Sequence, residues 1–222
     1  MDRLDRTAFR AVSFHEADNN AAYWLRQSVA DRLRAAGLLT RQAYGLPQLK
    51  TLSLNRDVAR VRIRAMSNNI FNPDFADFVK ALNRSGVRYM LVGGYAVIIH
   101  GYNRSTGDLD LWVEPTQANY RAVQTAFADF GMPLFDMTED KFLRTADYDV
   151  FSFGVPPVAI DLITHLKGLN FGDAYSRSSV YEFEDFAIRV IQYQDLLKAK
   201  QAAGRHRDLN DIEQLEKGRK AD

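Results

Sequence analysis

The sequence contains no cysteine and no long apolar run. The lack of cysteine excludes disulfides and cysteine–metal sites, and it is compatible with a cytosolic protein. No apolar stretch approaches the ~20 residues that are needed to span a bilayer. Residues 1–20, MDRLDRTAFRAVSFHEADNN, contain no apolar core of an export signal. We therefore expect a cytoplasmic protein with no membrane partner.

The chain also has little net charge, but its charges are unevenly distributed. Its formal net charge is +1 over 222 residues. Residues 1–70 carry 12 basic and 6 acidic residues, whereas the remaining 152 residues carry 17 and 22. This asymmetry favours a contact of the basic segment with nucleic acid or a partner, although a solvated basic helix would have the same composition. The length and the 46% of hydrophobic residues suit one sizeable globular domain, or one domain with an appendage.

Residues 1–65 differ in pattern from the rest of the chain. Apolar residues recur at helical spacing between Tyr23 and Leu39. The stretch LNRDVARVRIRAM then alternates basic and aliphatic residues, which fits a helix or a strand. Met66 with Ser-Asn-Asn after it resembles a second beginning. We predict that residues 1–65 form a basic, mainly helical N-terminal extension or fused partner module, and that residues 66–222 form the main domain.

From residue 71 onward, helical and extended patterns alternate. NPDFADFVKALNRSG predicts a helix that Asn72 caps, with Pro73 in its first turn and Gly86 at its end. TQANYRAVQTAFADFG predicts another helix, and QYQDLLKAKQAAGRHRDLNDIEQLEK predicts two closing helices that break at Gly204. The predicted strands are RYMLV, DLDLWV, YDVFSF, PVAIDLIT, VYEFED and AIRVIQ, while YAVIIHG fits either structure. The expected fold class is α/β (or α+β), with a mixed β-sheet flanked by helices.

Two glycines and two aspartates stand out within this domain. Gly93 and Gly94 follow the strand RYMLV, where glycine lets backbone N–H groups approach an anion, although a tight turn also needs small residues. In DLDLW, strand alternation places Asp108 and Asp110 on one face. Two neighbouring carboxylates repel, and a divalent cation removes that conflict. The alternative is a solvent-facing strand with two acids.

A third acid, Asp161, lies within the apolar strand PVAIDLIT. A carboxylate there is costly unless it has a partner. It becomes reasonable if this strand lies beside DLDLW, so that Asp161 faces the same cation site. Three such carboxylates suit two metal ions about 4 Å apart that drive an in-line displacement at phosphorus.

These residues resemble the motifs of the nucleotidyltransferase superfamily, which has a polymerase-beta-like fold. Its members carry an apolar residue with Gly-Gly or Gly-Ser, then Asp-apolar-Asp/Glu-apolar about a dozen residues later, and a further Asp in a strand. Here these are Val92-Gly93-Gly94, Asp108-Leu109-Asp110-Leu111 and Asp161. GGYAVIIHGYNRSTGDLDLWV is similar to small bacterial members, including abortive-infection and toxin–antitoxin nucleotidyltransferases. The resemblance covers about residues 71–217, so residues 66–222 would be a nucleotidyltransferase domain with C-terminal helices.

The resemblance implies roles for individual residues. Asp108, Asp110 and Asp161 would be catalytic and would hold Mg²⁺ or Mn²⁺, with Asp161 serving the attacking hydroxyl. Gly93 and Gly94 would contact the phosphates of an NTP, ATP being favoured. Arg104 and Thr106 are candidates for the same phosphates, as is Lys198, and each has a plain structural alternative such as a solvated loop or helix face.

Three functions remain open at this point. The first is transfer of a nucleoside monophosphate from an NTP to a hydroxyl of RNA (tRNA) or protein, as in a toxin–antitoxin or phage-defence component with a cognate antitoxin or other partner protein. The second is a small-molecule adenylyltransferase of the aminoglycoside type, which needs an acidic pocket for its acceptor. The third is a non-catalytic antitoxin or binding module that keeps the fold. The presence of all three acids favours the enzymes.

Overall fold

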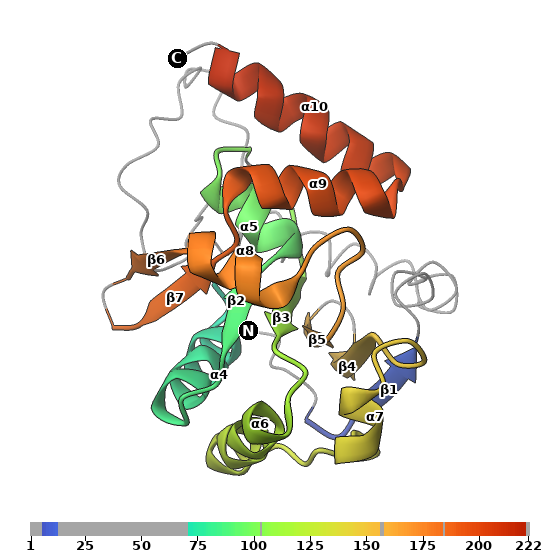
Figure 1. Cartoon of the computed structure of the whole chain (residues 1–222). Coiled ribbons are helices and arrows are strands. Elements are labelled where there is room, and N and C mark those ends of the chain that lie inside the picture. Colours follow the sequence, from blue (N-terminus) through green and yellow to red (C-terminus); the bar gives the residue numbers. More distant parts are fainter. Residues whose placement is uncertain (1–5, 13–70, 103, 156–157, 184, 221–222) are drawn as a thin grey trace, which may run out of the picture.

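A seven-stranded mixed β-sheet organises the described part of the chain (Figure 1). The computed structural model describes residues 6–12, 71–102, 104–155, 158–183 and 185–220. The strands are β1 (Phe9–Val12), β2 (Tyr89–Leu91), β3 (Asp108–Val113), β4 (Val150–Val155), β5 (Val158–Ile163), β6 (Ser179–Glu182) and β7 (Ala187–Val190). Their order across the sheet is β1-β4-β5-β3-β2-β7-β6. The pairs β3–β5 and β2–β7 are parallel, and the other neighbouring pairs are antiparallel.

Helices cover this sheet and confirm the predicted α/β class. They are α4 (Pro73–Arg84), α5 (Gly93–Ile99), α6 (Gln117–Phe130), α7 (Glu139–Leu143), α8 (Phe171–Arg177), α9 (Tyr193–Ala203) and α10 (His206–Lys220). In Figure 1, α9 and α10 pack together at the top, α4 and α6 lie at the bottom, and the strands lie between these two layers. No helix of the described residues is long and apolar enough to cross a membrane.

Local sequence signals explain where the predicted helices begin and end. Asn72 caps α4, because its side chain accepts a hydrogen bond from the Asp74 N–H at 2.9 Å. Thr116 caps α6 in the same way, and Gly131 ends that helix in the left-handed conformation. Gly204 ends α9, as the sequence predicted. The ambiguous segment YAVIIHG is helical, since most of it forms α5.

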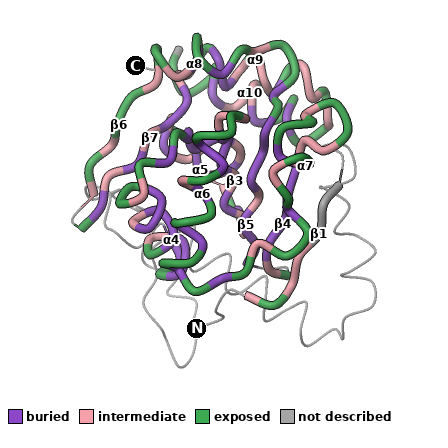
Figure 2. Tube along the Cα trace, turned by 60° about the horizontal axis from the view of Figure 1, so that its bottom comes forward, coloured by how far each residue is buried: buried purple, intermediate pink, exposed green. Residues whose placement is uncertain are grey.

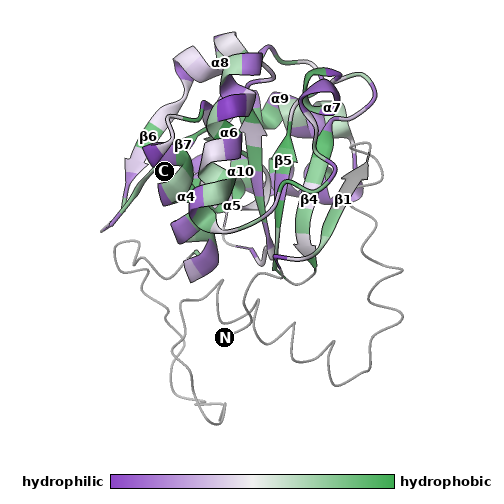
Figure 3. Ribbon diagram, turned by 90° about the horizontal axis from the view of Figure 1, so that it is seen from below, coloured by the Kyte–Doolittle hydropathy of each residue, from purple (hydrophilic) through white to green (hydrophobic). Residues whose placement is uncertain are grey.

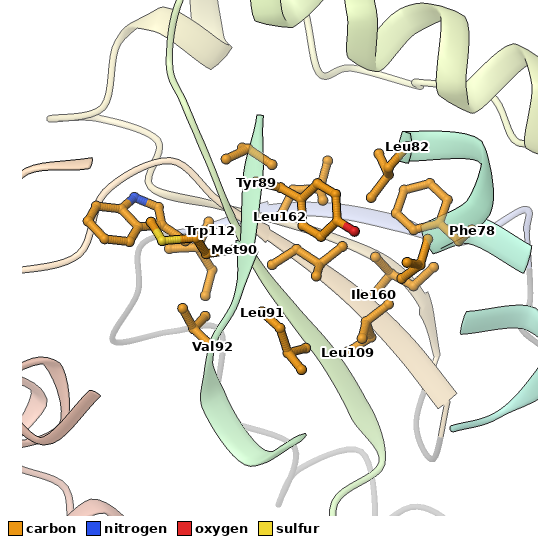
Figure 4. Close-up of a cluster of buried hydrophobic side chains, with 14 of the residues drawn as sticks. Phe78, Leu82, Tyr89, Met90, Leu91, Val92, Leu109, Trp112, Ile160 and Leu162 are labelled. Carbon is orange, nitrogen blue, oxygen red and sulfur yellow. The ribbon is translucent and has the colours of Figure 1, made fainter. Parts of the chain in front are cut away.

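Alternation along the strands divides the sheet into two faces. Figure 4 shows Leu109 and Ile160 on the same side as Phe78 of α4, whereas Met90 and Trp112 lie together on the opposite side. Trp112 packs edge-on against Phe171 of α8, with ring centroids 5.2 Å apart. The central strands are therefore buried and hydrophobic, while the outward parts of the helices are hydrophilic (Figures 2 and 3).

The described part of the N-terminal segment joins this sheet. β1 pairs with the edge of β4, and Phe9 stacks on Phe135 and packs against Phe153, with ring centroids 5.5 and 5.1 Å apart. The Arg6 guanidinium lies 3.9 Å from the centre of the Phe130 ring and hydrogen-bonds to the Phe130 carbonyl. Residues 9–12, which lie within the predicted N-terminal extension, thus form a strand of the main sheet. The helical pattern between Tyr23 and Leu39 lies outside the described residues.

Candidate functional site

Strand pairing places the three predicted acids on one face of the sheet. Asp108 and Asp110 alternate with the buried Leu109 and Leu111 along β3. β5 runs parallel to β3, and Asp161 is the register partner of Asp110. Register partners in a parallel pair point to the same face, on backbones about 4.8 Å apart. The predicted neighbourhood of these two strands is therefore present, and all three acids are half-buried.

The glycine turn between β2 and α5 lies directly against one of these acids. Gly93 has φ +59°, and a Cβ added to it would lie 2.0 Å from Asp110 Oδ2. The Gly94 N–H donates a hydrogen bond of 3.2 Å to the same oxygen. A Cβ at Gly94 would lie 2.3 Å from Thr106 Oγ1. Both glycines are therefore required by the close approach of side chains, and the turn orients the carboxylate of Asp110.

The loop before β3 brings two further predicted residues to this turn. Thr106 is buried against Gly94, and Arg104 Nη2 would lie 2.9 Å from a Cβ on Gly94. Arg104 Nε lies 3.0 Å from Asp211 Oδ1 of α10, and the Arg104 side chain is only 12% exposed. The structure thus gathers the glycines, Asp110, Arg104 and Thr106.

Behind Arg104 lies a buried charge cluster that the sequence analysis missed. Lys200 Nζ of α9 lies 2.9 Å from Asp208 Oδ1 and 2.7 Å from Asp211 Oδ2 of α10. Arg205 Nε lies 2.7 Å from the other Asp208 oxygen. Arg104 Nε and both Asp211 oxygens make no well-angled hydrogen bond within the described residues, so their short distances are charge contacts. We call Arg104, Lys200, Asp208 and Asp211 the buried charge cluster.

The sequence holds a signal for this cluster that could have been read. Leu196 and Lys200 are four residues apart on α9, and so lie on the same helix face. Leu196 is buried there, which puts a lysine at a position where the pattern calls for an apolar residue. Asp208 and Asp211 are likewise three residues apart on α10. A lysine in an apolar stripe, followed by two acids on one face, indicates a buried ion pair.

Burial and nearby charges act in opposite directions on Asp110. Burial is the largest influence and raises the pKa of Asp110 above its usual value of 3.8. The Gly94 N–H and the positive charges of Lys200, Arg104 and Arg207 oppose this and lower the pKa. The hydroxyl of Tyr95 is fully buried close by, and burial together with the charges of Asp108 and Asp110 raises its pKa. Lys200, Arg104 and Arg207 therefore supply the positive charge that acts on Asp110.

Lys198 does not join this group. It lies two residues from Lys200, which is about 200° around the helix. Its side chain is 65% exposed, and its Nζ lies 4.0 Å from Asp195 Oδ1. The Nε2 of His100 lies 2.8 Å from the Ile191 carbonyl oxygen, which gives this ring a structural contact.

The acids fit a divalent cation that is shared with a substrate. Among the described residues, no group of three or more His, Asp or Glu side chains lies close enough to hold a metal ion. Mg²⁺ commonly uses one or two carboxylates together with substrate phosphates and water. Asp108 and Asp110, on one strand face beside Arg104, suit this mode.

Comparison with solved structures gives a similarity of overall chain path. No protein-family model matches the chain, and no curated protein matches it. Among solved structures, it is similar to the lincosamide antibiotic adenylyltransferase LnuA in its lincomycin-bound crystal structure. The identity is 17% and the TM-score 0.44, and the match covers 66% of this chain and 96% of that one. We base the function on the residues of the site, since similarity at this level does not carry it.

Proposed function

We propose that the protein is a metal-dependent nucleotidyltransferase, which moves a nucleoside monophosphate from an NTP to a hydroxyl and releases pyrophosphate. The observation that carries the proposal is the contact between Gly93, Gly94 and Asp110, with Asp161 in register beside it. A glycine turn fitted around a half-buried carboxylate is costly to maintain for packing alone. It is useful where a nucleotide triphosphate and its cation bind.

The residues of the site have distinct parts in this reaction. Asp108 and Asp110 would hold Mg²⁺ or Mn²⁺, which supplies positive charge to the triphosphate when bound. Arg104 and Thr106 would bind phosphate oxygens through a guanidinium fork and a hydroxyl. Asp161 would accept the proton of the attacking hydroxyl as its oxygen forms a bond to the α-phosphorus. The bond from that phosphorus to the bridging oxygen breaks, and pyrophosphate leaves with the electron pair.

The favoured acceptor is a hydroxyl of RNA or protein. A small cationic acceptor needs an acidic pocket, for which the sequence candidates are Glu114, Asp136, Glu139, Asp140 and Asp149. Glu114, Asp136 and Asp140 contact Arg88, Lys141 and Arg144 respectively, whereas Glu139 accepts a hydrogen bond from the neutral Gln117 side chain. The small-molecule alternative therefore stays open beside the RNA or protein acceptor. A toxin–antitoxin or phage-defence setting with a partner protein stays a prediction from the sequence resemblance.

Incubation of the full chain with each α-labelled NTP, Mg²⁺, total tRNA and cell lysate tests the proposal. We expect label to enter a macromolecular fraction, and we expect the Asp108→Ala/Asp110→Ala variant to lose this transfer while remaining folded. A non-catalytic module would bind nucleotide and transfer none. Transfer that persists in the double variant would remove these two acids from the mechanism.

A further inference from the structure

A group of cations gathers around α8 and the beginning of α9. Figure 1 shows α8 beside β7, with α9 above them. We call the group the α8–α9 basic surface. Its members are Arg88, Arg177, Arg189, Lys198 and Arg219. Within the described residues, the carboxylates that contact these cations are Glu114 and Asp195, and the Asp195 side chain is only 1% exposed beneath Arg177 and Lys198. These five cations therefore outnumber the two carboxylates that contact them.

Aromatic rings hold several of these cations. The guanidinium carbons of Arg88 and Arg189 each lie 4.4 Å from the centre of the Tyr175 ring. Arg219 lies 4.4 Å from the centre of the Tyr193 ring. A ring fixes a guanidinium without neutralising it, whereas a carboxylate would neutralise it. In the described part of the chain, Arg189 and Arg219 make no ion pair, so their charges are available to a ligand.

This surface continues toward the candidate active site. Arg88 precedes β2, and its Nε lies 2.8 Å from Glu114, which follows β3. Four residues of extended chain separate Glu114 from Asp110, a distance of about 13 Å. Arg189 lies on β7, whose Val190 is the register partner of Leu91 in β2. A bound polymer could therefore extend from Arg88 along β3 toward the three acids.

We propose that the α8–α9 basic surface binds the sugar-phosphate backbone of single-stranded RNA and leads its terminal hydroxyl toward Asp161. The inference rests on the proposed function and names its acceptor class. Phosphates would contact the cations, and guanidinium groups that lie over tyrosine rings can also stack on unpaired bases. Lys198 then belongs to the acceptor surface and not to the triphosphate site.

Salt-dependent RNA binding by the full chain tests the proposal. The probe is a fluorescein-labelled single-stranded RNA of about 12 nucleotides. The variant Arg189→Gln/Arg219→Gln removes two ring-held charges. Each phosphate contact contributes about 0.7 to the slope of log K against log salt, so the slope should shrink by about 1.4. At ~50 mM salt, the affinity should fall on the order of 50-fold. Arg84→Gln/Arg121→Gln, which removes two exposed charges from α4 and α6, should change neither quantity.

The charge-retaining variant Arg189→Lys/Arg219→Lys separates charge from a structural effect. It should keep the parental slope. Three results would each overturn the proposal. They are an unchanged salt slope in the Gln variant, an equal loss of slope in the Lys variant, and a parental protein that binds a polyglutamate peptide in place of RNA. Labelled-NTP transfer on the same preparations is scored separately. RNA binding that depends on the basic surface without any transfer would reject the enzyme and leave the RNA surface standing.

Discussion

Replacing Asp211 by Asn tests whether the buried charge cluster holds α10 against the loop of the candidate site. Asp211 is fully buried between Arg104 Nε at 3.0 Å and Lys200 Nζ at 2.7 Å. Asn keeps the size and shape of the side chain and removes its charge. Lys200 then retains Asp208, while Arg104 loses the carboxylate that it contacts. The variant therefore leaves a buried guanidinium poorly compensated.

The expected cost follows from this burial. Removing one partner of a buried ion pair costs about 3–5 kcal/mol, and we expect the lower part, about 3–4, because Lys200 keeps a second acid. In a chain of this size, 1 kcal/mol corresponds to about 2–4 °C in Tm, so Tm should fall by about 6–16 °C. The matched control is Asp129→Asn, because Asp129 and Arg84 form an ion pair whose side chains are 44% and 60% exposed. That change should cost less than about 1 kcal/mol.

Urea unfolding followed by circular dichroism measures both variants. Raising the salt concentration should reduce the small effect of Asp129→Asn and leave the large effect of Asp211→Asn, since buried pairs are screened less. A double variant, Arg104→Gln/Asp211→Asn, should be less destabilised than the two single changes predict, by about 0.5–3 kcal/mol. A cost of Asp211→Asn no greater than that of Asp129→Asn would refute the reasoning.

Four further predictions concern the site and the N-terminal strand. Asp161→Asn should leave NTP affinity within about tenfold (~1.4 kcal/mol), measured by titration, and reduce single-turnover transfer by at least ~10²; a parental rate would remove Asp161 from catalysis. Asp110→Asn should raise the Tm of the metal-free protein at neutral pH. Burial raises the pKa of Asp110 in the folded protein above 3.8. The folded protein therefore loses stability as the pH rises from 3.8 through this raised pKa, because the buried carboxyl must ionise. The variant has no carboxyl at this position and should not lose stability in this pH range. Gly93→Ala should reduce transfer by at least ~10². The control is Gly86→Ala, because Gly86 has a similar φ but a Cβ added to it has nothing within 4 Å, and this variant should keep the parental rate. Equal effects of the two changes would show that backbone strain alone matters. A chain that begins at Met66 lacks β1 and should unfold at a lower temperature than the full chain. Equal midpoints of thermal unfolding for the two chains would contradict this.

Short-range chemistry made much of this fold predictable. Asn72 and Pro73 specify the start of α4 because a side-chain acceptor and a fixed φ act within one turn. The alternation in DLDLWV specifies both the strand and the shared face of Asp108 and Asp110, because the side-chain period of a strand is two. The position of Asp161 beside Asp108 and Asp110 was predicted because an unpartnered carboxylate in an apolar strand is costly. The pairing of β3 with β5 agrees with this prediction.

Other features depend on residues that are far apart in the sequence. YAVIIHG has no decisive period, and it is helical because the Gly93–Gly94 turn directs the chain over β3. The strand β1 could not be recognised in FRAV, because a four-residue edge strand is defined by the partner it finds, here β4.

The sequence by itself determined the α/β class, the helix ends and the alternation that puts two acids on one strand face, since each depends on interactions within a few residues. Only the tertiary structure decided which acids pair with Lys200 and which glycine touches Asp110. Lys198 and Lys200 are equally basic and lie on the same helix. The packing of α9 against α10 separates them, because only the face turned toward α10 loses its water and must pair its charge.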